Sequence, residues 1–192
     1  MRKGKPYIVL AAVLALASPS FGSAVDELMR EAGKLKPQGK VRYETQMMDE
    51  LVISPQNASK RYEGQLTGLM ILAMNPYLEP GMTKKAIEYG YDVNAEADNG
   101  MTALMYAAMV ANNDVARLLI DSGADVNAKD KMAGLNALMY SVSANNLECI
   151  RILLEAGADV NAKNVNGTNA LELAEGLSAS DEVKKVLLEA MK

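Results

Sequence analysis

The chain has 192 residues, of which 49% are hydrophobic and 23% are charged, a balance that indicates one globular domain or one compact repeat array. It contains no histidine and a single cysteine, Cys149. This composition excludes a histidine-dependent catalytic triad, a histidine-ligated zinc site and an intramolecular disulfide. The net charge of −4 does not favour nucleic acid as a partner.

The first 24 residues predict an export signal. Basic residues precede an apolar run from 7 to 17, and Gly22 and Ala24 suit the small-residue positions of a signal-peptidase site. This run is too short to cross a hydrocarbon core, which needs roughly twenty apolar residues. We therefore expect cleavage after Ala24, export, and no stable membrane insertion of the mature protein.

Residues 25–63 predict two helices ahead of the rest of the fold. Residues 26–36 place apolar side chains on one side of a helix, which a Pro-Gln-Gly sequence then breaks. Residues 41–53 predict a second helix, and residues 54–59 predict a loop. We expect this segment to form an N-terminal helical cap, with a degenerate repeat as the alternative.

The remainder of the chain is an internal repeat. Gly90, Gly123 and Gly157 each begin the sequence Gly-x-Asp-Val-Asn-Ala, with spacings of 33 and 34 residues. A second block of the same period is an apolar helical run preceded by a threonine or asparagine. These preceding residues are Thr67, Thr102, Asn136 and Asn169.

Local rules predict the structure of one unit. Threonine and asparagine are N-cap residues, so each apolar run is expected to begin a short first helix. A second helix follows, such as residues 114–121, and it ends near a glycine suited to left-handed backbone geometry. Residues 98–100 and 165–167 supply turns before the first helices of two units.

These blocks resemble ankyrin repeats, as residues 100–108 and 118–128 show most clearly. The resemblance covers about residues 64–192, and it implies an all-α ankyrin-repeat solenoid of helix–helix–turn-finger units. The four expected repeats are 64–96, 97–129, 130–163 and 164–192.

The sequence departs from the family pattern at several positions. The family's proline and histidine are replaced in the second repeat by Ala103 and Met105, and its inter-helix Gly-His by Ala111-Asn112. In the third repeat that pair is Asn145-Asn146, and asparagine tolerates left-handed geometry. We expect the turns to survive and the repeats to be less rigid than typical ones.

The cysteine, the methionines and the repeated aspartates could be reactive, but their places in the repeat predict structural roles. Cys149 aligns with Val115 and Val183 on the second helices, so we expect a buried apolar residue, with a reactive thiol as the alternative. Repeat-linked methionines are expected in the core: Met70, Met105 and Met139. Repeat-linked aspartates are expected to bond to local backbone: Asp92, Asp125 and Asp159. We expect no catalytic residue, metal or cofactor.

The resemblance implies that partners bind the finger tips and the exposed side of the first helices, on the concave face. The predicted binding residues are Asp98, Asn99, Met101, Met109, Val110, Met132, Leu135, Val165 and Asn166. This set is apolar for a solvent-exposed face, which indicates a protein-binding site.

We therefore expect a monomeric, non-enzymatic scaffold that binds another protein. The export signal and single array resemble the small periplasmic ankyrin-repeat proteins of Gram-negative bacteria, which implies a periplasmic location, with secretion as the alternative. Two other functions stay open: a secreted effector that binds a host protein, and a redox or thiol protein that uses Cys149.

Overall fold

The computed structural model describes residues 53–76 and 78–192. The expected signal segment at 1–24 and the expected helix at 26–36 lie outside these residues, as does the helix expected at 41–53 except for Ile53. In the segment expected to be a loop, 54–59, Pro55–Asn57 forms a 3-10 turn, η1. A second 3-10 turn, η2 (Glu63–Gln65), lies beyond that segment.

Four pairs of helices follow, and the described part of the chain contains no strand. The pairs are α4 (Gly68–Ala73) with α5 (Pro80–Glu88), α6 (Ala103–Met109) with α7 (Asn113–Asp121), α8 (Ala137–Ser143) with α9 (Leu147–Glu155), and α10 (Ala170–Gly176) with α11 (Asp181–Ala190). The predicted all-α repeat solenoid is confirmed. None of the helices in this part is long and apolar enough to span a membrane.

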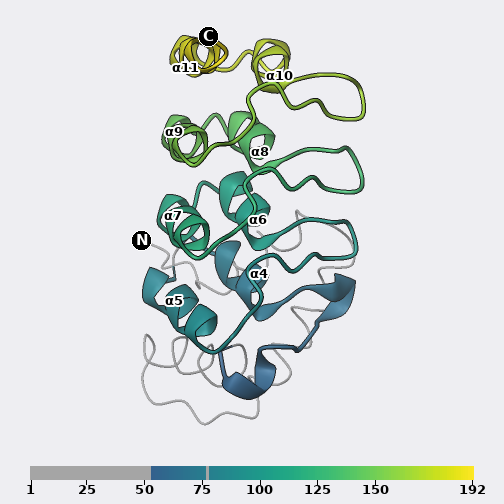
Figure 1. Cartoon of the computed structure of the whole chain (residues 1–192), viewed down its shortest axis with the longest axis vertical. Helices are drawn as coiled ribbons and strands as arrows, with labels where there is room; N and C mark the ends of the chain where they lie inside the picture. Colours follow the sequence, from purple (N-terminus) through teal and green to yellow (C-terminus); the bar gives the residue numbers. More distant parts are fainter. Residues whose placement is uncertain (1–52, 77) are drawn as a thin grey trace, which may run out of the picture.

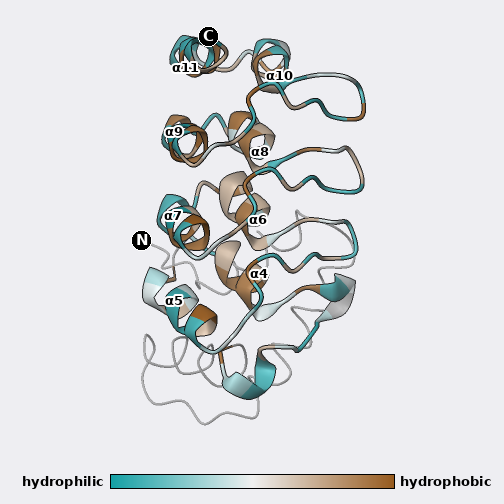
Figure 2. Ribbon diagram, viewed as in Figure 1, coloured by the Kyte–Doolittle hydropathy of each residue, from teal (hydrophilic) through white to brown (hydrophobic). Residues whose placement is uncertain are grey.

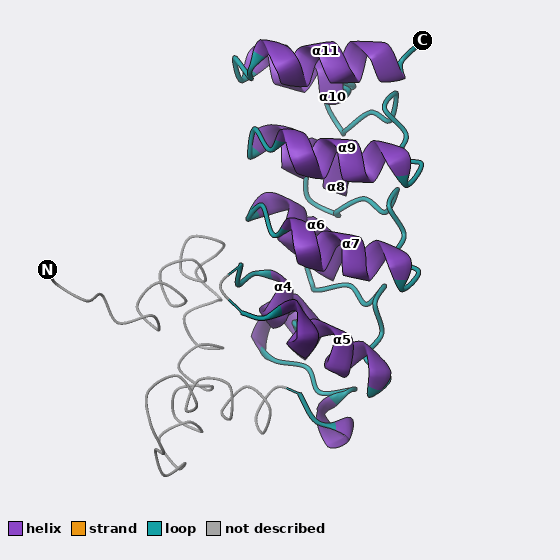
Figure 3. Ribbon diagram, turned by 90° about the vertical axis from the view of Figure 1, so that its left-hand side faces the viewer, coloured by secondary structure: helices purple, strands orange, loops and turns teal. Residues whose placement is uncertain are grey.

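The pairs stack in register along one axis. Figure 1 shows the first helices, α4, α6, α8 and α10, in one column and the second helices in another, with loops projecting beside the first column. Each helix packs on its counterpart in the next pair, as the side view in Figure 3 also shows. The core is therefore continuous from one repeat to the next, and each repeat contacts only its neighbours.

The predicted N-caps of the first helices are confirmed. Each side-chain oxygen accepts a hydrogen bond from the N–H three residues later, which satisfies one of the helix's free donors. The donor–acceptor distances are 3.2 Å at Thr67, 3.4 Å at Thr102, 3.0 Å at Asn136 and 2.9 Å at Asn169.

The predicted glycine ends of the second helices are also confirmed. Gly90, Gly123 and Gly157 have φ angles of 85°, 88° and 87°. After α7, the Ala124 N–H donates back to the carbonyl of Leu119 at 3.0 Å, which closes the end of the helix. The second helices of the first three pairs therefore stop at the position that the repeat pattern gives.

The turns between paired helices differ from expectation at two places. In the first pair the sequence over residues 75–81 predicts the inter-helix loop. Its last two residues, Pro80 and Gly81, instead begin α5, with proline in the first turn where it loses no helical bond. In the second pair the left-handed residue is Ala111, at φ 60°, rather than an asparagine. Asn112 is buried instead, and its Nδ2 donates to the carbonyls of Ala73 and Asn75 at 3.3 Å.

Replacing Ala111 with glycine is expected to raise the free energy of unfolding by about 0.5–1 kcal/mol. A left-handed alanine costs about 1–2 kcal/mol, which exceeds the 0.4–1 kcal/mol lost through the more flexible unfolded chain. Urea unfolding followed by circular dichroism measures the change. The control is Asn145→Gly, at φ 50° in the third pair, where a smaller gain is expected because asparagine tolerates this geometry. A destabilised Ala111→Gly variant would contradict the left-handed backbone conformation at residue 111.

Apolar side chains fill the space between repeats. Met70, Met105 and Met139 are fully buried, which confirms their expected place in the core. Figure 2 shows hydrophobic colour on the first helices and hydrophilic colour on the outer turns of α7 and on much of the loops. Burial on the inner faces of both columns is thus the main stabilising contribution.

Charged side chains occupy the outer face of the last helix pair. Glu175 aligns with Val142, and Lys184 aligns with Ile150. Val142 and Ile150 are 1% and 0% exposed, whereas Glu175 is exposed and Lys184 is half-buried. The last helix pair therefore presents a polar outer face.

Candidate protein-binding surface

A short loop, here called a finger, precedes each first helix. Fingers one to four are residues 62–66, 97–101, 130–135 and 164–168. In each finger the first N–H donates to the last carbonyl, at 2.9–3.0 Å. Gly100, Gly134 and Gly167 turn fingers two to four with φ angles of 79°, 68° and 76°, which confirms the turns predicted at 98–100 and 165–167.

The fingers are joined to one another through their backbones. One N–H of each finger donates to a carbonyl of the preceding finger at 2.9 Å: Asp98 to Gly64, Lys131 to Asn99, and Val165 to Ala133. A Cβ on Gly100 would lie 2.7 Å from the backbone nitrogen of Lys131, so only glycine allows this approach. The finger tips therefore form a row whose spacing is set by main-chain contacts.

A buried carboxylate organises finger three, which is one residue longer than fingers two and four. Asp130 is 5% exposed. Its Oδ1 accepts hydrogen bonds from the N–H groups of Met132 and Ala133, each at 2.7 Å, and its Oδ2 accepts from the N–H of Leu135 at 2.8 Å. These bonds satisfy the loop's donors and hold Met132 at the tip.

Tyrosines on two first helices link those helices to their fingers. The Tyr140 hydroxyl donates to Asp130 Oδ2 at 3.2 Å, and Tyr106 forms a side-chain hydrogen bond with Asn99. Burial raises the pKa of both hydroxyls, and the negative carboxylate of Asp130 raises the pKa of Tyr140 further. Both tyrosines therefore stay protonated at neutral pH, as the donor role of Tyr140 requires.

The finger tips of repeats three and four expose two apolar side chains. Met132 is 76% exposed and Val165 is 68% exposed, on fingers whose backbones are directly bonded. Asp98 and Asn166 are also exposed, and Asn99 is half-buried because its Oδ1 accepts from the Met101 N–H at 3.0 Å.

Three other predicted residues lie at the edge of this surface. Met109 and Leu135 are half-buried and pack against the core, and Val110 is half-buried at the end of α6. Part of each side chain is exposed to solvent, and the remainder packs inside the protein.

The expected exposure of Met101 is wrong. Its side chain is only 7% exposed and belongs to the core. Met101 stands between the finger turn and the N-cap Thr102, where the chain runs back toward α6, and Leu135 and Thr168 are half-buried at the same place in fingers three and four. This position is half-buried in repeats three and four and buried in repeat two, so Met101 does not belong to the binding surface.

The sequence interpretation missed Leu177, which is 53% exposed directly after α10. It aligns with Val110 and Ala144, so the same repeat alignment that selected Val110 could have found it. The candidate surface is therefore the set Asp98, Met132, Val165, Asn166 and Leu177, which follows the fingers and the adjacent ends of the first helices.

Cys149 is fully buried on α9, which confirms the expected apolar packing. Burial, and secondarily the negative charge of Glu148, raises the pKa of its thiol to about 12. The thiol is therefore almost entirely protonated at neutral pH, which disfavours nucleophilic or redox chemistry.

A thiol reagent at pH 8 is expected to modify native Cys149 about a thousandfold more slowly than the unfolded chain. A pKa near 12 instead of about 8.5 lowers the thiolate fraction by that factor, and burial adds to the delay. The time course of labelling with and without urea measures the ratio. Comparable rates in the two conditions would favour a reactive thiol.

The repeated aspartates have the expected structural role. Asp92, Asp125 and Asp159 each accept, through Oδ1, the N–H two residues later at 2.8–2.9 Å. Each therefore stabilises its own extended loop. In the described residues, no three cysteine, aspartate or glutamate side chains gather as a metal ion would require.

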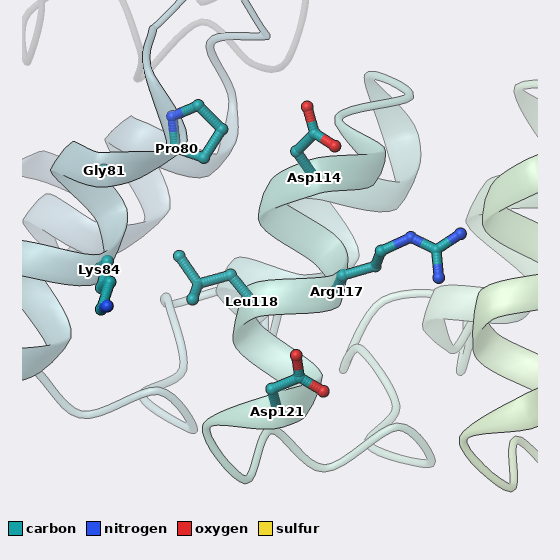
Figure 4. Close-up of a pocket in the computed structure, with 7 residues that line it drawn as sticks. All are labelled: Pro80, Gly81, Lys84, Asp114, Arg117, Leu118 and Asp121. Carbon is teal, nitrogen blue, oxygen red and sulfur yellow. The ribbon is translucent and has the colours of Figure 1, made fainter.

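A shallow groove lies between α5 and α7, in the column of second helices away from the fingers (Figures 1 and 4). Its volume is about 300 Å³, and it is lined by Pro80, Gly81, Lys84, Asp114, Arg117, Leu118 and Asp121. Figure 4 shows Leu118 pointing toward α5 and Arg117 pointing away from it, where Arg117 lies 3.5 Å from Glu148. The charged groups reach solvent around the groove, whose own surface is open and mainly apolar.

Comparison with protein families matches two models of ankyrin repeats. A model of three ankyrin-repeat copies matches residues 40–130, and a model of many copies matches residues 133–174. Comparison with curated proteins gives no match. Ankyrin repeats generally mediate protein–protein interaction, which agrees with the apolar finger tips. With its stacked helix pairs and bonded fingers, the chain belongs to the ankyrin-repeat family.

Proposed function

We propose that this chain is an exported, non-enzymatic scaffold that binds another protein through its finger tips and the adjacent ends of its first helices. The observation that best supports this binding surface is the pair of exposed apolar side chains, Met132 and Val165. They lie on two fingers whose backbones are directly hydrogen-bonded. An apolar side chain held on a preformed loop can enter a partner with little loss of conformational entropy.

Export and location belong to the same proposal. The basic start, the short apolar run and the small residues before position 25 support cleavage after Ala24. We propose the periplasm as the location and a protein of the cell envelope as the partner. The raised pKa and full burial of Cys149 argue against the thiol alternative.

The double variant Met132→Asp, Val165→Asp is expected to bind the partner at least tenfold more weakly, because each carboxylate would be desolvated without a pair. The free energy of unfolding should change by no more than about 0.5 kcal/mol, since both side chains are largely exposed. Affinity capture from an envelope fraction measures binding, and urea unfolding of each bait protein measures stability.

Signal cleavage is tested separately. The intact mass of native chain from the envelope fraction shows whether residues 1–24 have been removed.

The matched control is Leu188→Asp, on α11 in the second column, where the leucine is 52% exposed. This variant also places a carboxylate at an exposed apolar position, and it should bind normally. Full binding by the double finger variant would contradict the proposed surface, and full-length native chain in the envelope fraction would contradict signal cleavage.

A further inference from the structure

Residues 127–133 hold a neighbouring extended segment, residues 157–165, by polar contacts to that segment's main chain, while Ala158 and Val160 of the segment pack in the core. The Asn127 side chain donates to the carbonyl of Gly157 at 3.2 Å and accepts from the N–H of Asp159 at 2.8 Å. Lys129 Nζ donates to the carbonyl of Lys163 at 2.7 Å. With the bond from Val165 N–H to the Ala133 carbonyl, three sites within residues 127–133 contact main-chain groups over residues 157–165.

The same contacts recur in the earlier repeats. Asn94 donates to the carbonyl of Gly123 at 3.0 Å and accepts from the Asp125 N–H at 2.7 Å, in the same way as Asn127. Arg61, which aligns with Lys129, donates to the carbonyl of Glu96 at 3.4 Å. The three junctions use parts of one arrangement, an amide, a cation and a finger carbonyl, and the complete set occurs where residues 127–133 contact residues 157–165. At the preceding junction Glu96 stands in the place of the cation. Because these contacts reach main-chain groups, they do not depend on the segment's polar side chains.

Residues 161–166 carry the same arrangement, and no segment of the described residues is bound to it. The aligned groups are the Asn161 carboxamide, the Lys163 ammonium and the Asn166 carbonyl, and all three residues are exposed. Within residues 53–76 and 78–192, no hydrogen-bond or ion-pair partner contacts any of these three groups. The nearby helix face carries Glu175 and Lys184 where a further helix pair would bury apolar residues. This edge is therefore suited to an extended segment more than to another helix pair.

We propose that this edge, residues 161–166, binds an extended segment of the partner protein through main-chain hydrogen bonds, in the register that residues 157–165 adopt on residues 127–133. The inference rests on the proposed function, because it assumes a protein partner. The segment must offer carbonyls at its first and seventh positions and N–H groups at its third and ninth. Proline is excluded from the third and ninth positions, because it has no N–H. Main-chain pairing to an open edge is an established way for proteins to bind peptides.

The test uses a capped peptide with the sequence of residues 157–167, titrated into the isotope-labelled full chain. We expect saturable chemical-shift changes at Asn161, Lys163 and Gly167, with a dissociation constant of about 1 mM. Asn161→Ala should weaken binding at least fivefold. Asn166→Ala should bind normally, because that residue contributes only its carbonyl.

Two modified peptides supply the sharpest control. Methylation of the nitrogen that corresponds to Asp159 removes the N–H that bonds to the asparagine carboxamide, and it should reduce affinity at least fivefold. Methylation at the neighbouring Ala158 position should have no such effect, because in the fold the Ala158 N–H donates to Leu153 of its own repeat.

The absence of saturable shifts at peptide concentrations several times 1 mM would overturn the inference, as would shifts confined to Met132 and Leu177. Equal affinities of the two methylated peptides would also overturn it. None of these results affects the proposed function, which fails only if the partner still binds the double finger variant.

Discussion

Replacing Leu119 with alanine is expected to lower the free energy of unfolding by about 2–5 kcal/mol. Leu119 is fully buried on α7, and α7 packs on its own first helix and on the second helices of both neighbouring repeats. Shortening the side chain removes apolar burial and leaves a cavity that rigid neighbours fill only partly. Leu153, also fully buried at the aligned position of α9, should behave in the same way.

The matched control is Leu118→Ala on the same helix. Leu118 is half-buried at the groove between α5 and α7, so the same substitution should cost less than about 1 kcal/mol. Because both variants exchange leucine for alanine in one helix, helix propensity contributes equally. The difference between the two measures burial alone.

Urea unfolding followed by circular dichroism measures both variants, and the slope of the transition carries further information. In a stacked array the loss at one repeat is transmitted to its neighbours through their interfaces. We expect one shifted transition, or a shallower one if the stack separates at repeat two. If Leu119→Ala lowers the free energy of unfolding by less than about 1 kcal/mol, the packing of α7 against its neighbours does not depend on Leu119.

Much of the fold could be predicted because its signals are local. An N-cap such as Thr102 and a left-handed glycine such as Gly123 act within a few residues, so a repeated sequence is enough to locate them. The buried place of Cys149 followed from alignment with Val115 and Val183. Such positions repeat because every internal repeat has the same neighbours.

The candidate site was less predictable because it depends on where loops point. Met101 and Met132 are both finger methionines, yet one is buried and the other is exposed. The difference arises from their position relative to the finger turn, which sequence spacing does not give. Asn112 was expected to serve the turn, but it reaches across to the preceding repeat, a contact between residues more than 30 positions apart.

The role of Asp130 was missed for a related reason. The sequence shows one extra residue in finger three and no indication of how the longer loop satisfies its donors. In repeat four the aligned residue is Asn164, whose single Oδ1 accepts from the N–H groups of Asn166 and Thr168. The longer finger uses both oxygens of a carboxylate for the same purpose.

Replacing Asp130 with alanine is expected to lower the free energy of unfolding by about 2–4 kcal/mol. Three backbone N–H groups and the Tyr140 hydroxyl would lose a charged acceptor in a 95% buried position. Hydrogen bonds to charged groups contribute about 1.5–3 kcal/mol each, and their contributions do not add when they share one acceptor. Urea unfolding measures the total.

Asp130→Asn is the control of equal size. Asparagine retains Oδ1 for Met132 and Ala133, but its Nδ2 cannot accept from Leu135 or Tyr140. We therefore expect about half the loss seen with alanine. Amide hydrogen exchange at Met132, Ala133 and Leu135 should accelerate in the alanine variant, and unchanged exchange at all three would contradict an organising role for the carboxylate.

Asp130→Ala should also weaken partner binding, although Asp130 lies below the surface. Met132 is held at the tip by a bond from its own N–H to Asp130, so a loosened finger must be ordered again when the partner binds. We expect Asp130→Ala to lose affinity and Asp130→Asn to lose less, in the order of their hydrogen-exchange rates. If affinity falls without any change in exchange, the carboxylate acts on the partner directly and not through the position of Met132.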